Sequence, residues 1–82
     1  MRFLLPFVAV ATILKYRKTF GETIRTRRKA LDMSQEKLAE KAELHHNYIG
    51  EIERGEKAAT IDTIMKIAKA LGVRAGDLFS DV

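Results

Sequence analysis

The chain contains no cysteine and only one proline among its 82 residues. Without cysteine there can be no disulfide framework, no thiolate metal site and no cysteine nucleophile, which fits a reducing compartment, and we expect a cytoplasmic location. The longest apolar run, residues 3–14, is interrupted by Pro6 and Thr12. It falls short of the roughly 20 residues that a helix needs to cross a bilayer, so the sequence argues against a membrane-spanning protein.

The usual signs of an enzyme are also missing. There is no glycine-rich phosphate loop, no nucleophile beside a recognisable base, and no pair of acids placed for a cleft. Two adjacent histidines, His45 and His46, project about 100° apart on a helix and do not make a two-histidine metal site. We therefore expect a protein that is not an enzyme and has no cofactor and no metal.

What is present is the composition of one small folded domain with excess positive charge. Hydrophobic residues make up 46% of the chain and charged residues 32%, which argues against disorder. Fifteen Lys and Arg residues against eleven Asp and Glu residues give a net charge of +4. This excess favours a polyanionic partner through electrostatic attraction.

Residues 1–18 differ in kind from the rest, because the first fourteen side chains are nearly all apolar and basic residues follow. We predict a boundary near Lys18, with an N-terminal extension over 1–18 and a domain over 19–82. A helix that starts at Pro6 would place Phe3, Phe7, Val10 and Leu14 on one face. Such a segment must be covered by this domain, by a second copy or by a membrane surface, and we favour dimerisation or self-packing. The alternative is an unselected extension whose natural start lies downstream.

The domain itself reads as all-α, with five helices and no strand. Helical spacing and caps predict helices over residues 20–31, 35–42, 45–54, 61–71 and 75–80. Thr19, Ser34 and Thr60 are predicted N-caps, Asp32 is predicted to be left-handed, and Gly55 to end the third helix. The apolar stripes include Leu31 and Ile61 and end in Leu78 and Phe79, while Met33, Met65 and Tyr48 are expected to fill the core.

The second and third predicted helices have the lengths and the short connection of a helix-turn-helix, whose second helix enters the major groove of DNA. His46 and Asn47 at the start of that helix, and Glu51 one turn later, are placed to read base edges. Gly50 between them is expected to face outward and let the helix approach closely. Phosphate contacts are predicted from the set Gln35, His45, Arg54 and Lys57.

Four short motifs together resemble the phage repressor and Cro type of helix-turn-helix regulator, also called the xenobiotic-response-element family. They are R-x-x-R from Arg25, S-Q-E-x-L-A from Ser34, N-Y-I-x-x-I-E-R-G from Asn47 and I-A-x-A-L-G-V from Ile67. The resemblance covers about residues 20–79. It implies that the positions of His45, His46, Asn47 and Glu51 face an operator, that Gln35 anchors on a phosphate, and that the loop with Lys57 touches the DNA backbone.

The resemblance also implies an ion pair between Arg28 and Glu53 that orients the third helix. The chain departs from the family at Asp32, where glycine is frequent, and at Ala59, where proline is common. The apolar N-terminal segment lies outside the family pattern, which puts the usual dimerisation through the last helix in question.

The sequence thus predicts a sequence-specific regulator of transcription that binds double-stranded DNA as a homodimer on a pseudo-palindromic operator. The alternative is an antitoxin or adaptor that acts through a protein partner. A third hypothesis is a membrane-associated regulator that uses residues 3–14 with Lys15, Arg17 and Lys18 at the headgroups. The operator, any effector and the choice between activation and repression stay open.

Overall fold

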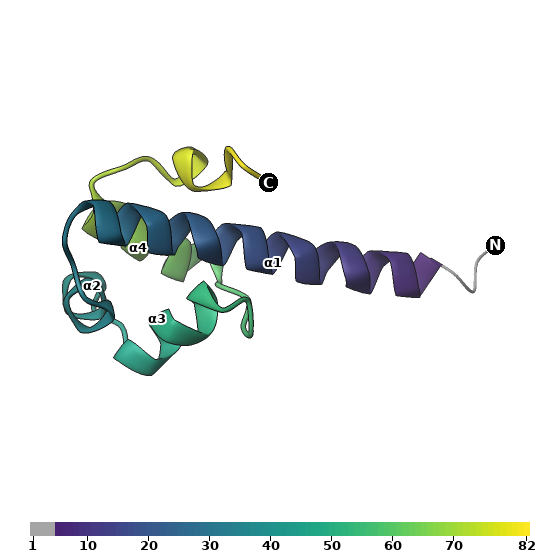
Figure 1. Ribbon diagram of the computed structural model, residues 1–82, viewed down its shortest axis with the longest axis horizontal. Helices are drawn as coiled ribbons and strands as arrows, with labels where there is room; N and C mark the ends of the chain where they lie inside the picture. Colours follow the sequence, from purple (N-terminus) through teal and green to yellow (C-terminus); the bar gives the residue numbers. More distant parts are fainter. Residues whose placement is uncertain (1–4) are drawn as a thin grey trace.

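The computed structural model describes the backbone of residues 5–82 and the side chains from Val8 onward. Four α-helices are followed by one 3-10 helix: α1 (Leu5–Ala30), α2 (Gln35–Ala42), α3 (His46–Glu53), α4 (Ile61–Leu71) and η1 (Ala75–Phe79). Figure 1 shows α2, α3, α4 and η1 gathered around one half of α1 while the other half projects away from them. Residues 5–82 contain no strand, so the all-α prediction is confirmed, although the fifth helix is a single 3-10 turn.

The first helix is continuous over 26 residues. The expectation that a new helix begins after an N-cap at Thr19 is wrong. Instead, the Thr19 carbonyl accepts a hydrogen bond of 3.1 Å from Oγ1 of Thr23, inside the helix. No proline interrupts residues 7–30, and the alanine, leucine, lysine and arginine residues there are good helix formers, so a local capping preference does not stop the helix. Helix α1 begins at Leu5, and the predicted roles of Phe3 and Phe7 lie outside the described side chains.

The other helix ends follow the local signals in the sequence. The Ser34 hydroxyl accepts from the backbone N–H of Lys37 at 3.0 Å and caps α2. Thr60 caps α4 in the same way. Asp32 adopts a φ of 55° between α1 and α2, the left-handed conformation expected there. Gly55 and Gly72 are also left-handed and follow α3 and α4.

The core lies among all five helices: α1 packs on α3, α2 packs on α3 and α4, and η1 packs on α1 and α4. Its fully buried side chains are Ile24, Leu38, Ile49, Ile52, Ile67 and Leu78. Phe79 is 42% exposed, so the prediction that it returns to the core is wrong, although its ring stacks on that of Phe20 with 4.9 Å between centroids. Met33 and Tyr48 pack at the edge of this core.

Three further predicted core positions are wrong. Ile61 is 78% exposed because it is the first residue of α4, beyond the packed turns. Met65, one turn later on the same face, and Leu31, which follows the end of α1, are each more than half exposed. Ile61 and Met65 share the outward face of α4, since Met65 lies about 160° of helical rotation away from the buried Ile67. Leu31 lies beyond the last turn of α1.

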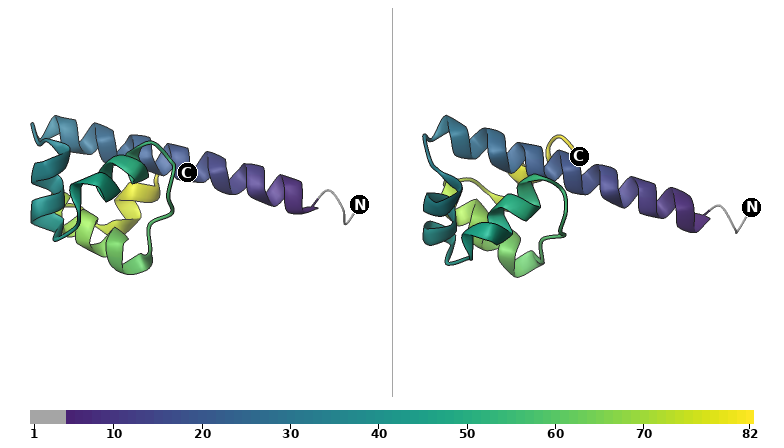
Figure 2. Two further views of the ribbon diagram at one scale, coloured as in Figure 1. Left: turned by 90° about the horizontal axis from the view of Figure 1, so that it is seen from below. Right: turned by 60° about the horizontal axis from the view of Figure 1, so that its bottom comes forward.

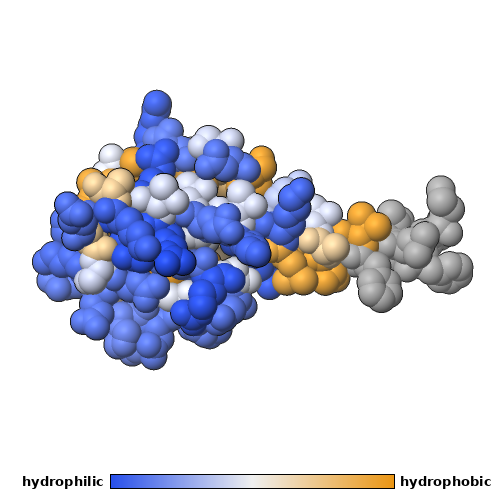
Figure 3. All heavy atoms as spheres, viewed as in Figure 1, coloured by the Kyte–Doolittle hydropathy of each residue, from blue (hydrophilic) through white to orange (hydrophobic). Residues whose placement is uncertain are grey.

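The projecting half of α1, residues 5–17, is called the arm below. Its apolar side chains Val8, Val10, Ile13, Leu14 and Tyr16 are each about half exposed. Figure 3 shows an apolar patch on the arm beside a mostly hydrophilic body. No described helix is both long enough and apolar enough to span a bilayer. The division into residues 1–18 and 19–82 stays a prediction, since α1 passes through the proposed boundary without a break.

Candidate nucleic-acid interface

Helices α2 and α3 form a tight pair joined by residues 43–45. Glu43 adopts a φ of 57°, and its backbone N–H closes α2 onto the carbonyls of Ala39 and Glu40. His45 then caps α3, because its Nδ1 accepts a hydrogen bond of 3.1 Å from the Asn47 N–H. A left-handed residue followed by a capped helix turns the chain sharply, which gives the helix-turn-helix arrangement seen from two directions in Figure 2.

Helix α3 presents one buried face and one exposed face. Ile49 and Ile52 anchor it in the core. His46 and Asn47 are exposed at its N-terminal end, and Glu51 is partly exposed one turn later. These three side chains therefore lie on the outward face of α3, as predicted.

A buried ion pair fixes α3 against α1. The guanidinium of Arg28 donates from Nε to Oε2 of Glu53 at 2.6 Å and from Nη2 to Oε1 at 3.0 Å. Its Nη1 donates to the Met33 carbonyl at 2.7 Å. Hydrogen bonding and the charge of Glu53 raise the pKa of Arg28, although burial acts in the opposite direction. The pair sets the position of α3 relative to α1, as the family resemblance implies.

Gln35 extends this network from α2. Its Nε2 donates to Oε1 of Glu53 at 3.0 Å. The amide is thus oriented by an internal carboxylate at the first turn of α2, and Oε1 of Gln35 lies beside Gly50 on α3. The sequence predicted a phosphate contact for Gln35 but not this bond, which links both helices of the pair to α1 through Arg28.

The expected exposure of Gly50 is wrong, because the side chains of Gln35 and Arg54 cover it. A Cβ at Gly50 would lie 3.0 Å from Nη1 of Arg54 and 3.3 Å from Oε1 of Gln35. Around it lies a hollow of about 330 Å³, lined by Gln35, His46, Asn47, Gly50, Glu51 and Arg54. Five of the seven residues predicted to contact DNA therefore meet in one recess with glycine at its floor.

The cations nearest to this hollow are paired with acids of the same chain. Nζ of Lys57 lies 3.4 Å from Oε2 of Glu51. Nε of Arg54 donates to Oε2 of Glu56 at 2.7 Å, and Nη2 donates to Oε1 at 3.2 Å. These hydrogen bonds raise the pKa of Arg54 and lower the pKa of Glu56. Both pairs are exposed to solvent, so an incoming phosphate can exchange with the carboxylates.

Glu56 is a residue that the sequence reading missed. Arg54 and Glu56 flank Gly55, whose left-handed backbone turns the two side chains toward each other. An R-G-E sequence at the end of a recognition helix was the available signal, but the pairing depends on the glycine conformation. Lys57 and His45 do not line the hollow. Lys57 pairs with Glu51, which does line it, and His45 caps α3.

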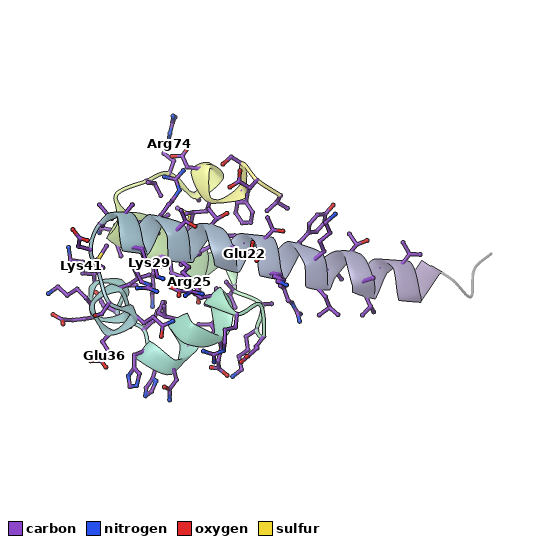
Figure 4. All side chains as sticks on the ribbon, in the orientation of Figure 1. Glu22, Arg25, Lys29, Glu36, Lys41 and Arg74 are labelled. Atoms are coloured by element: carbon purple, nitrogen blue, oxygen red, sulfur yellow. The ribbon has the colours of Figure 1, made fainter. Side chains whose placement is uncertain are left out.

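Only part of the basic run from Arg25 to Lys29 is free to meet a partner. Arg28 is buried, and Nη2 of Arg27 donates to the Asp77 carbonyl at 3.5 Å. Figure 4 shows Arg25 and Lys29 on the part of α1 that lies next to α2 and α3, whereas Arg74 lies on the opposite side of the molecule. Positive charge therefore flanks the helix pair from α1.

The two histidines stack on each other, with 4.6 Å between ring centroids. Among the residues that the structure describes, no group of three His, Cys, Asp or Glu side chains could hold a metal ion. Nδ1 of His45 is occupied by the cap, which leaves the exposed ring of His46 to face an incoming ligand.

Known proteins share this arrangement. The helix-turn-helix family model HTH_3 matches residues 24–78. Control protein C.BamHI of Bacillus amyloliquefaciens is 49% identical over 63 residues, which are 76% of this chain and 78% of that protein. Control protein C.SmaI of Serratia marcescens is 38% identical over 64 residues, 78% of this chain and 76% of that protein. The crystal structure of the restriction-modification controller protein C.AhdI from Aeromonas hydrophila matches with a TM-score of 0.76 and 36% identity, over 77% of this chain and 96% of that one.

The family match contains the features that build the candidate interface. It spans α2, α3 and α4, the hollow over Gly50 and both members of the Arg28–Glu53 pair. The arm precedes it. With two thirds of its length matched, the chain belongs to the helix-turn-helix family, in the phage repressor and Cro type that its sequence resembles.

Proposed function

We propose that this protein binds double-stranded DNA in a sequence-specific manner as a homodimer and regulates transcription from a pseudo-palindromic operator. The hollow over Gly50 is the observation that carries the proposal. It gathers groups that can donate to and accept from base edges at the exposed end of a helix held by a buried ion pair.

Each side chain has a role set by its place. His46 and Asn47 lie at the N-terminal end of α3, the part of a recognition helix that meets bases first. Glu51 accepts from a cytosine amino group and repels phosphates, so it serves choice of sequence more than affinity. Contacts to the DNA backbone set the position of the protein on the duplex, and they come from Gln35, His45, Arg54 and Lys57.

The ion pairs of Arg54 and Lys57 shape this binding. In the free protein, Glu56 and Glu51 occupy the places that phosphates take in the complex. When DNA binds, a phosphate replaces a carboxylate as the partner of each cation. The net free energy gained from each phosphate contact is therefore smaller, which weakens binding to random DNA. When Lys57 moves to a phosphate, Glu51 becomes free to accept from a base.

The relatives indicate the biological setting. C.BamHI and C.SmaI are control proteins by name, and C.AhdI is a restriction-modification controller. By likeness to them, we propose that the genes under control are those of a restriction-modification system. The protein-binding alternative, an antitoxin or adaptor, is not favoured by these relatives.

Selection of bound sites from random double-stranded DNA tests the proposal directly. We expect an enriched pool that contains two inverted half-sites about 34 Å apart, one turn of B-DNA. Affinity for the enriched site should exceed affinity for a scrambled duplex of equal length and should fall steeply with salt. A pool with no readable sequence would remove base recognition from the proposal.

A further inference from the structure

The apolar stripe by which α1 enters the core continues beyond the core. Phe20 and Ile24 face the packed interior. Ile13 lies two turns before Phe20 on the same side of the helix, and Val10 is three residues earlier. Within the domain this stripe is covered by α3, α4 and η1, but along the arm its side chains are about half exposed.

An apolar groove lies where the arm leaves the body. It has a volume of about 220 Å³, and its apolar lining comes mainly from Ile13, Tyr16, Phe20, Ala59, Ile64 and Phe79. Arg17 also lines it. The groove and the arm form one continuous surface, because Ile13 and Tyr16 belong to both. The same chain thus carries an apolar helix face, on the arm, and a groove into which such a face can pack.

We propose that this surface is a two-fold interface with a second copy of the chain, in which two arms pack antiparallel and cross near Ile13. The tip of each arm then lies over the groove of the other copy. The inference rests on the proposed function as a dimer and adds to it the surface that joins the two copies. In such an isologous contact each copy offers both the helix and the groove.

The length of the arm fits the operator spacing. Contacts between α1 and α3 run from Gly21 to Arg28, with Ile24 near their centre. Ile24 is eleven residues from Ile13, or about 16 Å at 1.5 Å per residue. A two-fold axis at Ile13 therefore separates the two α3 helices by about 33 Å along α1, close to the roughly 34 Å between half-sites one turn apart.

The orientation also fits. Phe20 and Ile64 of α4 share the groove, so the stripe faces the side on which α4 lies. Figure 2 (left) shows α4 across the molecule from α1, and Figure 1 shows α3 to one side of the line between them. The axis of an antiparallel pair is perpendicular to both helices and to the line joining them, so it runs along the direction from α1 to α3. Rotation about it keeps both α3 helices on one side of the dimer, where one face of a DNA duplex can meet both.

Two of the three basic residues in this part of α1 point away from the interface, whereas the third, Arg17, lies about 40° from Ile13 and lines the groove. Lys15 and Lys18 project from the side of the helix opposite to Ile13, since their positions differ from it by about 140° to 160° of helical rotation. Antiparallel packing through Ile13 therefore brings no lysines face to face. Val8 also lies off the stripe, more than 100° away from Ile13 by the same geometry, and it is 60% exposed. It provides a matched control on the same arm.

Single cysteines test the crossing point in the full-length protein. The chain has no cysteine of its own, so Ile13→Cys and Val8→Cys each carry one thiol. Helices that pack 8–10 Å apart, with Cα atoms about 2.3 Å from each axis, bring the two residues at a crossing to about 4–5 Å between Cα atoms, within disulfide reach. Under mild oxidation, I13C should form a covalent dimer on a non-reducing gel and V8C should stay monomeric. Equal cross-linking of the two, or none at position 13, overturns the crossing.

Mass in solution tests the interface without new covalent bonds. Across a concentration series, Ile13→Asp should raise the dimer dissociation constant at least tenfold, whereas Val8→Asp should change it by less than threefold. Equal helix content by circular dichroism shows that both variants fold. A wild-type protein that is monomeric at every concentration, or an I13D variant as dimeric as wild type, overturns the interface.

Binding to DNA and to vesicles distinguishes the proposed interface from the proposed DNA-binding function and from association with a membrane. I13D should keep wild-type affinity for a duplex with one half-site and lose affinity for a duplex with two. If I13D stays dimeric while wild type selects its operator, the interface is wrong and the proposed function stands. If I13D becomes monomeric while wild type selects no sequence, the proposed function is wrong and the interface stands. Flotation of monomeric wild type, but not I13D, with phosphatidylserine–phosphatidylcholine vesicles would assign the arm to a membrane surface instead.

Discussion

Arg28 of α1 and Glu53 of α3 face each other through two parallel hydrogen bonds in a site where both side chains are more than nine-tenths buried. Bidentate geometry of this kind fixes the angle between two helices as well as their distance. Because Gln35 also donates to Glu53, the same carboxylate locates both helices of the helix-turn-helix pair.

Removal of one partner of this pair should destabilise the fold strongly. Glu53→Ala leaves a buried guanidinium without its anion, and Arg28→Ala leaves a buried carboxylate, so each should cost about 3–5 kcal/mol of unfolding free energy. The double variant Arg28→Met with Glu53→Leu should recover much of that loss, since it leaves no unpaired charge. Urea unfolding of the three variants measures this. A double variant less stable than either single one would contradict the burial argument.

Two glycines should respond in opposite ways to alanine. A Cβ at Gly21 would come within 2.2 Å of the Ile52 carbonyl oxygen, a backbone atom that cannot step aside, so Gly21→Ala should lose more than about 2 kcal/mol of stability. At Gly50 the nearest atom is the mobile end of Arg54, and alanine has a helix propensity about 1 kcal/mol better than glycine. Gly50→Ala should therefore keep or raise the unfolding temperature while weakening operator binding, because it raises the floor of the hollow. Equal unfolding temperatures for both variants would contradict this reading.

Base reading and phosphate contact should be separable by mutation. Asn47→Ala should cost about 1–3 kcal/mol on the selected operator and little on a scrambled duplex. Lys57→Ala should weaken both duplexes alike and reduce the slope of log affinity against log salt by about one. Titrations of both duplexes at several salt concentrations measure the two effects. If Asn47→Ala loses affinity equally on both duplexes, Asn47 contacts the DNA backbone and does not read a base.

The Arg54–Glu56 pair should be visible in a titration. Its hydrogen bonds lower the pKa of Glu56, so the Glu56 carboxyl should titrate below the ordinary glutamate value of about 4.3, as followed by NMR. A folded-state pKa below the unfolded one stabilises the fold above the unfolded pKa, and this contribution is lost as pH falls through the folded value. In Arg54→Gln the Glu56 pKa should return to its ordinary range. An unchanged Glu56 midpoint in that variant would show that Arg54 is not the cause.

The same pair should limit binding to random DNA. Glu56→Gln removes the anion that holds Arg54 and frees the guanidinium for any phosphate. Affinity for a scrambled duplex should rise more than affinity for the operator, so the ratio between the two should fall. Glu22→Gln, on an exposed acid of α1, makes the same change of net charge as a control. If both variants raise affinity equally, net charge rather than the pairing is responsible.

Sequence alone predicted those parts of the fold that depend on a few neighbouring residues. Ser34 and Thr60 cap their helices, Asp32 takes the left-handed conformation, and the buried faces of α2 and α3 follow from spacing. Motifs that match a known family likewise supplied the ion pair at Arg28 before its geometry was seen. These signals depend on residues close together in the sequence, so they can be recognised without knowing how the helices pack.

Other features depend on how long side chains and helices lie in three dimensions. Thr19 carries a capping side chain, yet a cap contributes only about 1 kcal/mol and cannot end a helix whose neighbours all favour continuation. Gly50 sits on the outward face by periodicity, and it is buried only because Gln35 and Arg54 fold over it. The pairing of Arg54 with Glu56 depends on the backbone of Gly55. None of these can be read from residue spacing.

In the proposed dimer, an unbroken α1 makes the distance between the two α3 helices depend on the length of the helix. One residue added between Ile13 and Gly21 would lengthen each arm by about 1.5 Å and turn its apolar face by about 100°, which misaligns the pairing. Seven residues, nearly two full turns, would restore the phase but move the heads apart by about 21 Å, which is not a whole turn of B-DNA. Eleven residues, about three full turns, would restore the phase and add about 33 Å, close to one further turn of B-DNA, so only insertions near that length would keep both heads on one face of the duplex.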